Sequence, residues 1–462
     1  MFAINQAVKC GVRATSSFRS IATLRNPMIP TPGKQCKICS PEEAVRCVQS
    51  DDKVYLHMAA SCPVPLVNAL TETSIERGLK NVEMVHLLTE GTAPYTDPKY
   101  KDVFSTRGLF LTKNTRKAVN SGNADYVPVF FNMIPQMFKQ GILKVDCCFI
   151  QVSPPDENGM CTLGIGSECV PAALSTCKYI VAEINDKMPR TYGDVYIHIS
   201  NIDYAIKTSR DIPLVPPAKG NEQTAAIGKI IAENLIKDGA TLQVGIGTIP
   251  DAVLACLHNH KDLGVHTEMF TDGMVDLIKS GAVNNSKKID DNGKSTTTFV
   301  MGTQKTYEYV RENPLVTFRE VGYTNDPFVI MKQPGFVALN SCIEMDLTGQ
   351  IVSDSIGTSI FSGFGGQVDY LYGALRNPQG VPIIAIPSTT PKGASKIVPF
   401  LRPGAGVVTS RAHVRYIVTE YGIADLWGKS LRERARALIN ISHPNHRQSL
   451  YDAAVQQLGL KL

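Results

Sequence analysis

Short apolar runs alternate with helical patterns along most of the chain. Runs closed by glycine or proline predict strands at residues 54–58, 149–152, 179–183, 241–244 and 383–386. Between such runs, apolar residues recur at helical spacing. Residues 221–238 are one example, with a stripe that ends at Asp238-Gly239. Strands that alternate with helices are typical of an α/β fold with largely parallel sheets.

A cluster of three prolines divides the chain into two halves. It marks residues 214–220 as a linker between an N-terminal domain of residues 28–213 and a C-terminal domain of residues 221–462. Residues 51–70 align without gaps with residues 238–257, and both segments follow the order strand, tight loop, proline-opened helix. Only three of these twenty residues are identical, which chance also produces. We expect two similar open α/β domains with largely parallel sheets.

The excess of basic over acidic residues is concentrated at the start of the chain. The net charge is +5, yet the first 41 residues carry six Lys or Arg side chains and no acid. This Arg- and Ser-rich, acid-poor composition is typical of a mitochondrial transit peptide, here expected over residues 1–27, although a disordered basic tail is an alternative. Cleavage there removes Lys9, Arg13, Arg19 and Arg25 and leaves 5 − 4 = +1. We therefore expect a protein of the mitochondrial matrix that does not bind nucleic acid.

Neither a membrane span nor a metal site is expected. No stretch approaches the roughly 18 uninterrupted apolar residues that a spanning helix needs, so we expect no membrane partner. Most of the twelve cysteines stand singly in apolar surroundings, which suits buried free thiols. Cys36 and Cys39 form a CxxC pair, but no second ligand pair follows at the spacing of a structural zinc site.

A glycine-rich loop follows the predicted strand at 241–244. Residues 245–250 read GIGTIP, in which the glycines let the backbone approach a ligand and Pro250 suits the first turn of a helix. Free backbone N–H groups at such a helix start suit an anion or a developing oxyanion. Dinucleotide-binding domains carry GxGxxG at this place, so a Rossmann dehydrogenase is the rival interpretation on pattern alone.

Glu268 is the candidate reactive side chain. It ends a short predicted strand at residues 263–269, ahead of a helix for which Asp272 is the expected N-cap. Ligands of open parallel sheets collect outside the carboxyl ends of the strands, where the glycine loop also arrives. The residues alone leave Glu268 equally a solvated strand-end acid or a catalytic group. Its spacing from Gly245 also fits the ribose-binding acid of a dehydrogenase.

Several motifs in order along the chain carry a family resemblance. They are Gly245 to Pro250, His266-Thr-Glu-Met-Phe-Thr-Asp-Gly273, Asn340, Ser362-Gly-Phe-Gly-Gly-Gln-Val-Asp369 and Thr419-Glu-Tyr-Gly-Ile-Ala-Asp-Leu426. From about Cys39 to its end the chain resembles the acetyl-CoA hydrolase/transferase family, which includes succinate:acetate and 4-hydroxybutyrate CoA-transferases. This resemblance implies that Glu268 is the catalytic glutamate. It places coenzyme A (CoA) contacts at Gly245, Ile246, Gly247, Thr248, Ile249, Asn340 and Gly363.

The resemblance also implies a reaction. CoA would move from acetyl-, propionyl- or succinyl-CoA to a small carboxylate such as succinate or acetate, through an acyl-glutamyl anhydride and a glutamyl-CoA thioester on Glu268. CoA would be a substrate, and no cofactor is expected. An acyl-CoA hydrolase that uses the same glutamate and a non-catalytic CoA-binding protein are the alternatives. We also expect a homodimer, an ionised Glu268 with the ordinary glutamate pKa of about 4.3, and Val85 at the equivalent place in the first half.

Overall fold

The computed structural model describes residues 24–461. Most of the expected transit peptide, residues 1–23, therefore lies outside the described residues. From Pro27 onward the chain packs on the N-terminal half, because the Pro27 carbonyl accepts hydrogen bonds from the His198 N–H at 2.9 Å and from Asn201 Nδ2 at 2.8 Å. Within residues 24–461, no helix is both long and apolar enough to cross a membrane.

The N-terminal half is built on one eight-stranded sheet whose ladders are all parallel. In spatial order its strands are β1 (Lys37–Ile38), β10 (Tyr204–Thr208), β8 (Tyr179–Asn185), β6 (Cys147–Val152), β2 (Lys53–Leu56), β3 (Val82–His86), β4 (Phe104–Gly108) and β5 (Asp125–Tyr126). Its main helices are α2 (Val64–Ser74), α3 (Lys113–Asn120), α4 (Ile134–Lys139) and α5 (Val170–Thr176). The strands predicted in this half are confirmed, with bounds that differ by at most two residues.

The C-terminal half carries a second eight-stranded sheet. Its spatial order is β14 (Val316–Phe318), β13 (Ser295–Val300), β12 (Gly264–Phe270), β11 (Thr241–Val244), β15 (Val337–Ser341), β20 (Val381–Ala385), β22 (Tyr416–Thr419) and β23 (Gly422–Asp425). All of its ladders are parallel except β22 with β23. Its helices are α6 (Glu222–Asn234), α7 (Thr248–Ala255), α8 (Asp272–Lys279), α9 (Gln304–Val310), α10 (Val321–Thr324), α11 (Pro327–Ile330), α12 (Gln367–Arg376), α13 (Leu431–Asn440) and α14 (Pro444–Gln456).

The two sheets share one topology over seven of their eight strands, and only the outermost strand differs, being the parallel β1 in the first sheet and the antiparallel β23 in the second. In each half the first major strand (β2 or β11) lies in the middle, and the next three strands along the chain add outward on one side. The following strands, β6, β8 and β10 or β15, β20 and β22, add outward on the other side. The expectation of two similar α/β domains is therefore confirmed by strand order, although few residues of the repeat are identical.

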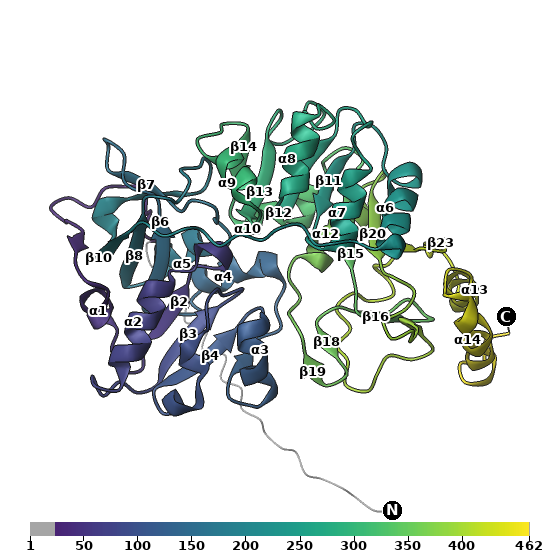
Figure 1. The fold of residues 1–462 in the computed structure, drawn as a ribbon, viewed down its shortest axis with the longest axis horizontal. Helices are drawn as coiled ribbons and strands as arrows, with labels where there is room; N and C mark the ends of the chain where they lie inside the picture. The colour runs from purple at the N-terminus through teal and green to yellow at the C-terminus, as the bar shows by residue number, and fades with distance from the viewer. Residues whose placement is uncertain (1–23, 462) are drawn as a thin grey trace, which may run out of the picture.

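The halves pack against each other over a continuous hydrophobic core, which includes Tyr55 and Ile150 from one sheet and Leu242 and Phe299 from the other. Figure 1 shows the N-terminal sheet on the left and the C-terminal sheet on the upper right, with α13 and α14 at the right-hand edge. The segment 209–220 joins the two halves without forming a helix or a strand. The region between the sheets is thus the place where residues of both halves meet.

One local prediction in the site region is wrong. Asp272 is the first residue of α8 rather than its N-cap, which is Thr271. The Asp272 carboxylate instead accepts hydrogen bonds from the Thr303 N–H at 3.1 Å and from the Thr306 hydroxyl. Asp272 therefore ties α8 to the start of α9, a contact between segments that are distant in sequence.

Candidate functional site

Glu268 lies near the carboxyl end of β12, at the edge of the sheet that the sequence indicated. The strand continues for two residues to Phe270, whose ring is buried and stacks on Tyr309. The glycine loop that follows β11 reaches the same edge, because β11 and β12 are adjacent parallel strands. The structure thus brings the predicted nucleophile and the predicted CoA loop together.

The Glu268 carboxylate is half-buried and held by donors from two other segments. Asn325 Nδ2 donates to Glu268 Oε2 at 2.8 Å, and the Gly366 N–H also donates to the carboxylate. Burial raises the pKa of Glu268 to about 7, because the charged form loses hydration, and these two hydrogen bonds oppose the rise. The expectation of an ordinary glutamate pKa is therefore wrong. The carboxylate is instead a desolvated, more basic anion when ionised.

Asn325 is itself oriented by buried neighbours. Its side chain is fully buried, and its Oδ1 accepts a hydrogen bond from the Tyr370 hydroxyl at 3.0 Å. The Asp369 carboxyl, also buried, accepts from the Asn132 N–H at 3.2 Å and hydrogen-bonds to the Asn325 side chain. Because Tyr370 occupies the amide oxygen, the Asn325 Nδ2 group is directed at the two carboxyls. The network leaves Asn325 one orientation.

His266 fixes the segment that carries Asn325. Its ring is fully buried, and Nε2 lies 2.7 Å from the Thr324 carbonyl oxygen. Burial lowers the pKa of His266 to about 3, so the ring is neutral and Nε2 carries the proton that it donates. The strand of Glu268 is thereby bonded to the residue that precedes Asn325.

The glycine-rich loop between Ser362 and Gln367 needs glycine at two positions for different reasons. A Cβ atom on Gly366 would lie 2.0 Å from Glu268 Oε2, so only glycine allows this backbone to approach the carboxylate. A Cβ atom on Gly363 would lie 2.9 Å from the Phe110 ring. The loop packs on the N-terminal half, since the Leu111 N–H donates to the Ser362 carbonyl at 3.1 Å. Both halves therefore build the site.

Two cavities meet at Glu268. The polar cavity, about 210 Å³, is lined by Gln243, Gly245, Asn340, Ser362, Gly363 and Gln367 among others. The apolar cavity, about 170 Å³, is lined by Leu87, Leu88, Leu109, Phe131, Ile246 and Phe299 among others. Glu268, Met269 and Phe110 line both. One carboxylate thus faces a cavity that offers polar groups and a second cavity that is mainly apolar.

The predicted CoA contacts distribute unevenly around these cavities. Gly245, Asn340 and Gly363 line the polar cavity, and Asn340 Nδ2 donates to Gln243 Oε1 at 3.1 Å. Ile246 points to the apolar cavity instead. Gly247, the N-cap of α7 with φ +125°, and Thr248 line neither cavity, and Ile249 is buried in the core. The loop therefore offers its first residue to the polar side and its second to the apolar side.

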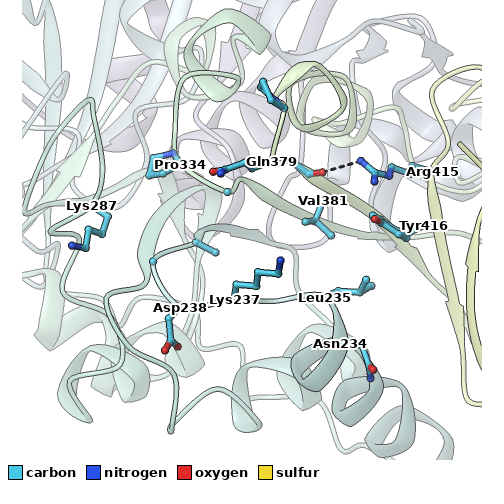
Figure 2. Close-up of a pocket in the computed structure, with 15 residues that line it drawn as sticks. Asn234, Leu235, Lys237, Asp238, Lys287, Pro334, Gln379, Val381, Arg415 and Tyr416 are labelled. Atoms are coloured by element: carbon cyan, nitrogen blue, oxygen red, sulfur yellow. Dashed lines mark hydrogen bonds between the residues drawn. The ribbon is translucent and has the colours of Figure 1, made fainter.

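A larger cavity of about 790 Å³ lies at the opposite edge of the same sheet, where β11, β15, β20 and β22 begin. Figure 2 shows Lys237, Gln379, Val381 and Tyr416 around it, with Arg415 donating to the Gly380 carbonyl at 3.4 Å. None of the predicted site residues lines it. The size of a cavity alone therefore does not identify the candidate active site.

Known proteins match this chain over almost its whole length. The model of the acetyl-CoA hydrolase/transferase N-terminal domain matches residues 34–216, and that of the C-terminal domain matches residues 302–454. The chain belongs to the acetyl-CoA hydrolase/transferase family.

Individual members of this family are similar throughout. The "Succinyl-CoA:acetate/propanoyl-CoA:succinate CoA transferase" of Fasciola hepatica is 47% identical over 94% of this chain and 91% of its own. The "4-hydroxybutyrate coenzyme A transferase" of Clostridium kluyveri is 47% identical over 90% of this chain and 96% of its own. The crystal structure of RipA from Yersinia pestis covers 92% of this chain and 98% of its own, with a TM-score of 0.85 and 32% identity.

Several side chains of this family site were missed by reasoning from the sequence. Asn325 and Tyr370 were not singled out, and Gly366 and Asp369 were included only in a longer motif. Asn325 follows a four-residue helix in a segment that carries no site pattern. Its contact with Glu268 joins positions 57 residues apart, and only the folded chain shows it.

The repeat partner of Glu268 also needs correction. Tyr55 pairs with Val85 in the first sheet, and Leu242, which aligns with Tyr55, pairs with Val265 in the second. Val85 is therefore equivalent to Val265, three residues before Glu268. Counting the same three residues onward places Leu88, rather than Val85, at the position in the first half that is equivalent to Glu268.

Proposed function

We propose that this protein transfers CoA from an acyl-CoA to a small carboxylate, acetate and succinate among them, through covalent intermediates on Glu268. The observation that carries the proposal is the position of this carboxylate between a polar and an apolar cavity, held by Asn325 and Gly366. The polar cavity suits the thiol end of CoA, since Gly245, Asn340 and Gly363 line it. The names of the similar proteins agree with this reaction class.

In the first step, ionised Glu268 attacks the carbonyl carbon of the acyl-CoA thioester. A carbon–oxygen bond forms, the carbon–sulfur bond breaks, and CoA leaves as a thiolate, which gives an acyl-glutamyl anhydride. Since Asn325 holds Oε2, the other carboxylate oxygen is free to attack. The raised pKa makes that oxygen a stronger nucleophile than an exposed glutamate.

In the second step, the CoA thiolate attacks the carboxyl carbon of Glu268. The first acid leaves as a carboxylate, and a glutamyl-CoA thioester remains. Negative charge develops on the Glu268 oxygen that did not carry the acyl group. Asn325 Nδ2 and the Gly366 N–H are the donors already directed at this carboxyl. One donor of this kind typically contributes about 3 kcal/mol of barrier lowering.

A second carboxylate then reverses the sequence. It attacks the glutamyl thioester, forms a new anhydride, and is attacked in turn by the CoA thiolate at its own carbonyl. The new acyl-CoA leaves and Glu268 is regenerated. The energy of the thioester is conserved at each step, provided that water does not reach the intermediates.

The assay that tests this proposal follows two products at once. The purified full chain is mixed with acetyl-CoA, with and without succinate or propionate, while free thiol and new acyl-CoA are measured. The proposal predicts new acyl-CoA only with an acceptor and little free thiol. Rapid thiol release without an acceptor would instead indicate the hydrolase, and the absence of both products would refute an enzymatic role.

We also propose that the protein works in the mitochondrial matrix as a homodimer. The acid-free, basic segment before Glu42 supports the location. Fusing residues 1–27 to a fluorescent reporter tests it, since the reporter should colocalise with a matrix marker. Light scattering coupled to size exclusion should give twice the chain mass.

A further inference from the structure

We propose that the cavity of about 790 Å³ at the edge of the C-terminal sheet opposite Glu268 is a second ligand site, which binds a nucleoside polyphosphate. We call it the lysine cavity, after Lys237 and Lys287 in its lining. It lies where β11, β15, β20 and β22 begin, whereas Glu268 and Asn340 lie near the ends of strands of the same sheet. This site is therefore separate from the one to which we assign CoA transfer.

Positive side chains outnumber negative ones in the lining of the lysine cavity. Lys237, Lys287 and Arg415 come from three segments that are distant in sequence, and Asp238 is the one acid among the lining residues that the structure describes. The Asp238 carboxylate already accepts a hydrogen bond from the Lys261 N–H at 2.9 Å. A concave site in which one sign of charge prevails concentrates ions of the opposite sign. The lining therefore favours an anion.

Four lining side chains have polar ends that bind nothing else within residues 24–461. The Nζ atoms of Lys237 and Lys287, the side-chain amide of Gln379 and the Tyr416 hydroxyl make no hydrogen bond or ion pair in this part of the chain. All four groups can donate hydrogen bonds, and the two lysines also carry positive charge. Hydrogen bonds from such cations to phosphate oxygens are stronger than those between neutral groups. These donors are therefore available to a phosphate-bearing ligand.

The lysine cavity also has an apolar part. Figure 2 shows Lys287 on the left of the cavity and Leu235, Val381 and Tyr416 on the right, with Lys237 between them. The volume of about 790 Å³ lies in the range of sites for small organic ligands and exceeds what a single phosphate fills. A nucleoside polyphosphate fits both parts, because its phosphates can bind the lysines while its base packs on the aliphatic and aromatic side chains.

Isothermal titration calorimetry on the purified full chain tests the proposal, with ATP, AMP and inorganic triphosphate as ligands. Each titration is run with and without saturating free CoA, which occupies the CoA site. We expect ATP to bind in both cases. It should bind more tightly than AMP, because it carries more phosphates, and more tightly than inorganic triphosphate, because its base adds an apolar contact. Added salt should weaken the binding, since it screens exposed charges.

Two double variants assign the binding to the lysine cavity. Lys237→Glu combined with Lys287→Glu reverses both free charges, and we expect the Kd for ATP to rise at least about ten-fold. Lys80→Glu combined with Lys279→Glu is the matched control, because both side chains are exposed and neither lines the cavity. The control changes the net charge by the same amount, and we expect it to bind ATP like the wild type.

Three outcomes would overturn the proposal. The first is a wild type that does not bind ATP, and the second is an equal Kd for ATP in the two double variants. The third is ATP binding that disappears when CoA is present, because the nucleotide would then occupy the CoA site. None of these results bears on the CoA-transfer reaction, which is measured separately with acyl-CoA and an acceptor acid.

Discussion

Asn325 Nδ2 lies 2.8 Å from Glu268 Oε2, and the Tyr370 hydroxyl holds the other end of the same amide. In the proposed reaction, this arrangement orients the carboxylate before attack and afterwards faces the oxygen on which negative charge would develop. Truncating Asn325 should therefore affect the chemical steps more than the binding of CoA.

The first prediction concerns Asn325→Ala. We expect kcat to fall about 100-fold, with a smaller change in KM, because one donor to the developing oxyanion is lost. Steady-state kinetics with acetyl-CoA and propionate measure both constants. Asn234→Ala is the control, since the Asn234 side chain is exposed and bonds only its own helix in the described structure. Equal kinetics in wild type and Asn325→Ala would contradict this role.

The second prediction concerns Gly366→Ala. The new methyl group would lie 2.0 Å from Glu268 Oε2 and 2.2 Å from Asn325 Nδ2, so the carboxylate must move. We expect activity to fall by at least about 100-fold through the loss of this alignment. Circular dichroism and thermal unfolding should show that the variant still folds. Activity within a factor of three of wild type would show that the close approach is not needed.

The third prediction is a pH profile. Only ionised Glu268 attacks, and burial raises its pKa from 4.5 to about 7. The value of kcat/KM should therefore rise with pH and reach half of its plateau near pH 7. In Asn325→Ala the midpoint should move to higher pH, because the Asn325 hydrogen bond lowers this pKa. Asp369 and Tyr370 also lie close to the Glu268 carboxylate. The pH profile of Asp369→Asn therefore shows how far this second acid contributes to the midpoint. A wild-type midpoint near 4.5 would contradict the burial.

The fourth prediction links the same pKa to stability. A carboxyl whose pKa is raised by folding contributes fully to stability below its unfolded pKa, and this contribution is lost as pH rises through the folded pKa. Glu268→Gln removes the buried charge. We expect its Tm at pH 8 to exceed that of wild type, on the order of 2 °C, and the difference to vanish below about pH 4.5. A lower Tm for Glu268→Gln at pH 8 would count against the raised pKa.

The fifth prediction concerns Gly245→Ala. A Cβ atom at this position meets no protein atom within 4 Å, so the free protein has room for it. If CoA occupies the polar cavity, the methyl group obstructs the ligand. We expect an unchanged Tm and a KM for acyl-CoA that is at least about ten-fold higher. Unchanged kinetics would place CoA elsewhere.

Patterns along the chain predicted what depends on near neighbours in sequence. Strand 241–244, the helix after the glycine loop and the place of Glu268 at a strand end all follow from local periodicity and turn residues. The presence of two similar sheets was also predicted, although Val85, the residue predicted to be equivalent to Glu268, was wrong by three residues. A short loop difference shifts such a count, and only the strand register corrects it.

The carboxylate's environment could not be predicted in this way. Asn325, Gly366 and Leu88 reach Glu268 or its cavities from three separate segments, and nothing local marks their approach. The raised pKa of Glu268 follows from that convergence, since burial is its main cause and residues of both halves line the cavities at Glu268. The family resemblance indicated Glu268 as the candidate nucleophile, and the fold accounts for its raised pKa.

The central claim is that Glu268 carries CoA. Incubating the protein with acyl-CoA alone, quenching in acid and analysing peptides by mass spectrometry tests it directly. We predict a CoA adduct on the peptide that contains Glu268, removed by added acetate and absent from Glu268→Gln. An adduct on another residue, or full transfer activity in Glu268→Gln, would contradict the account.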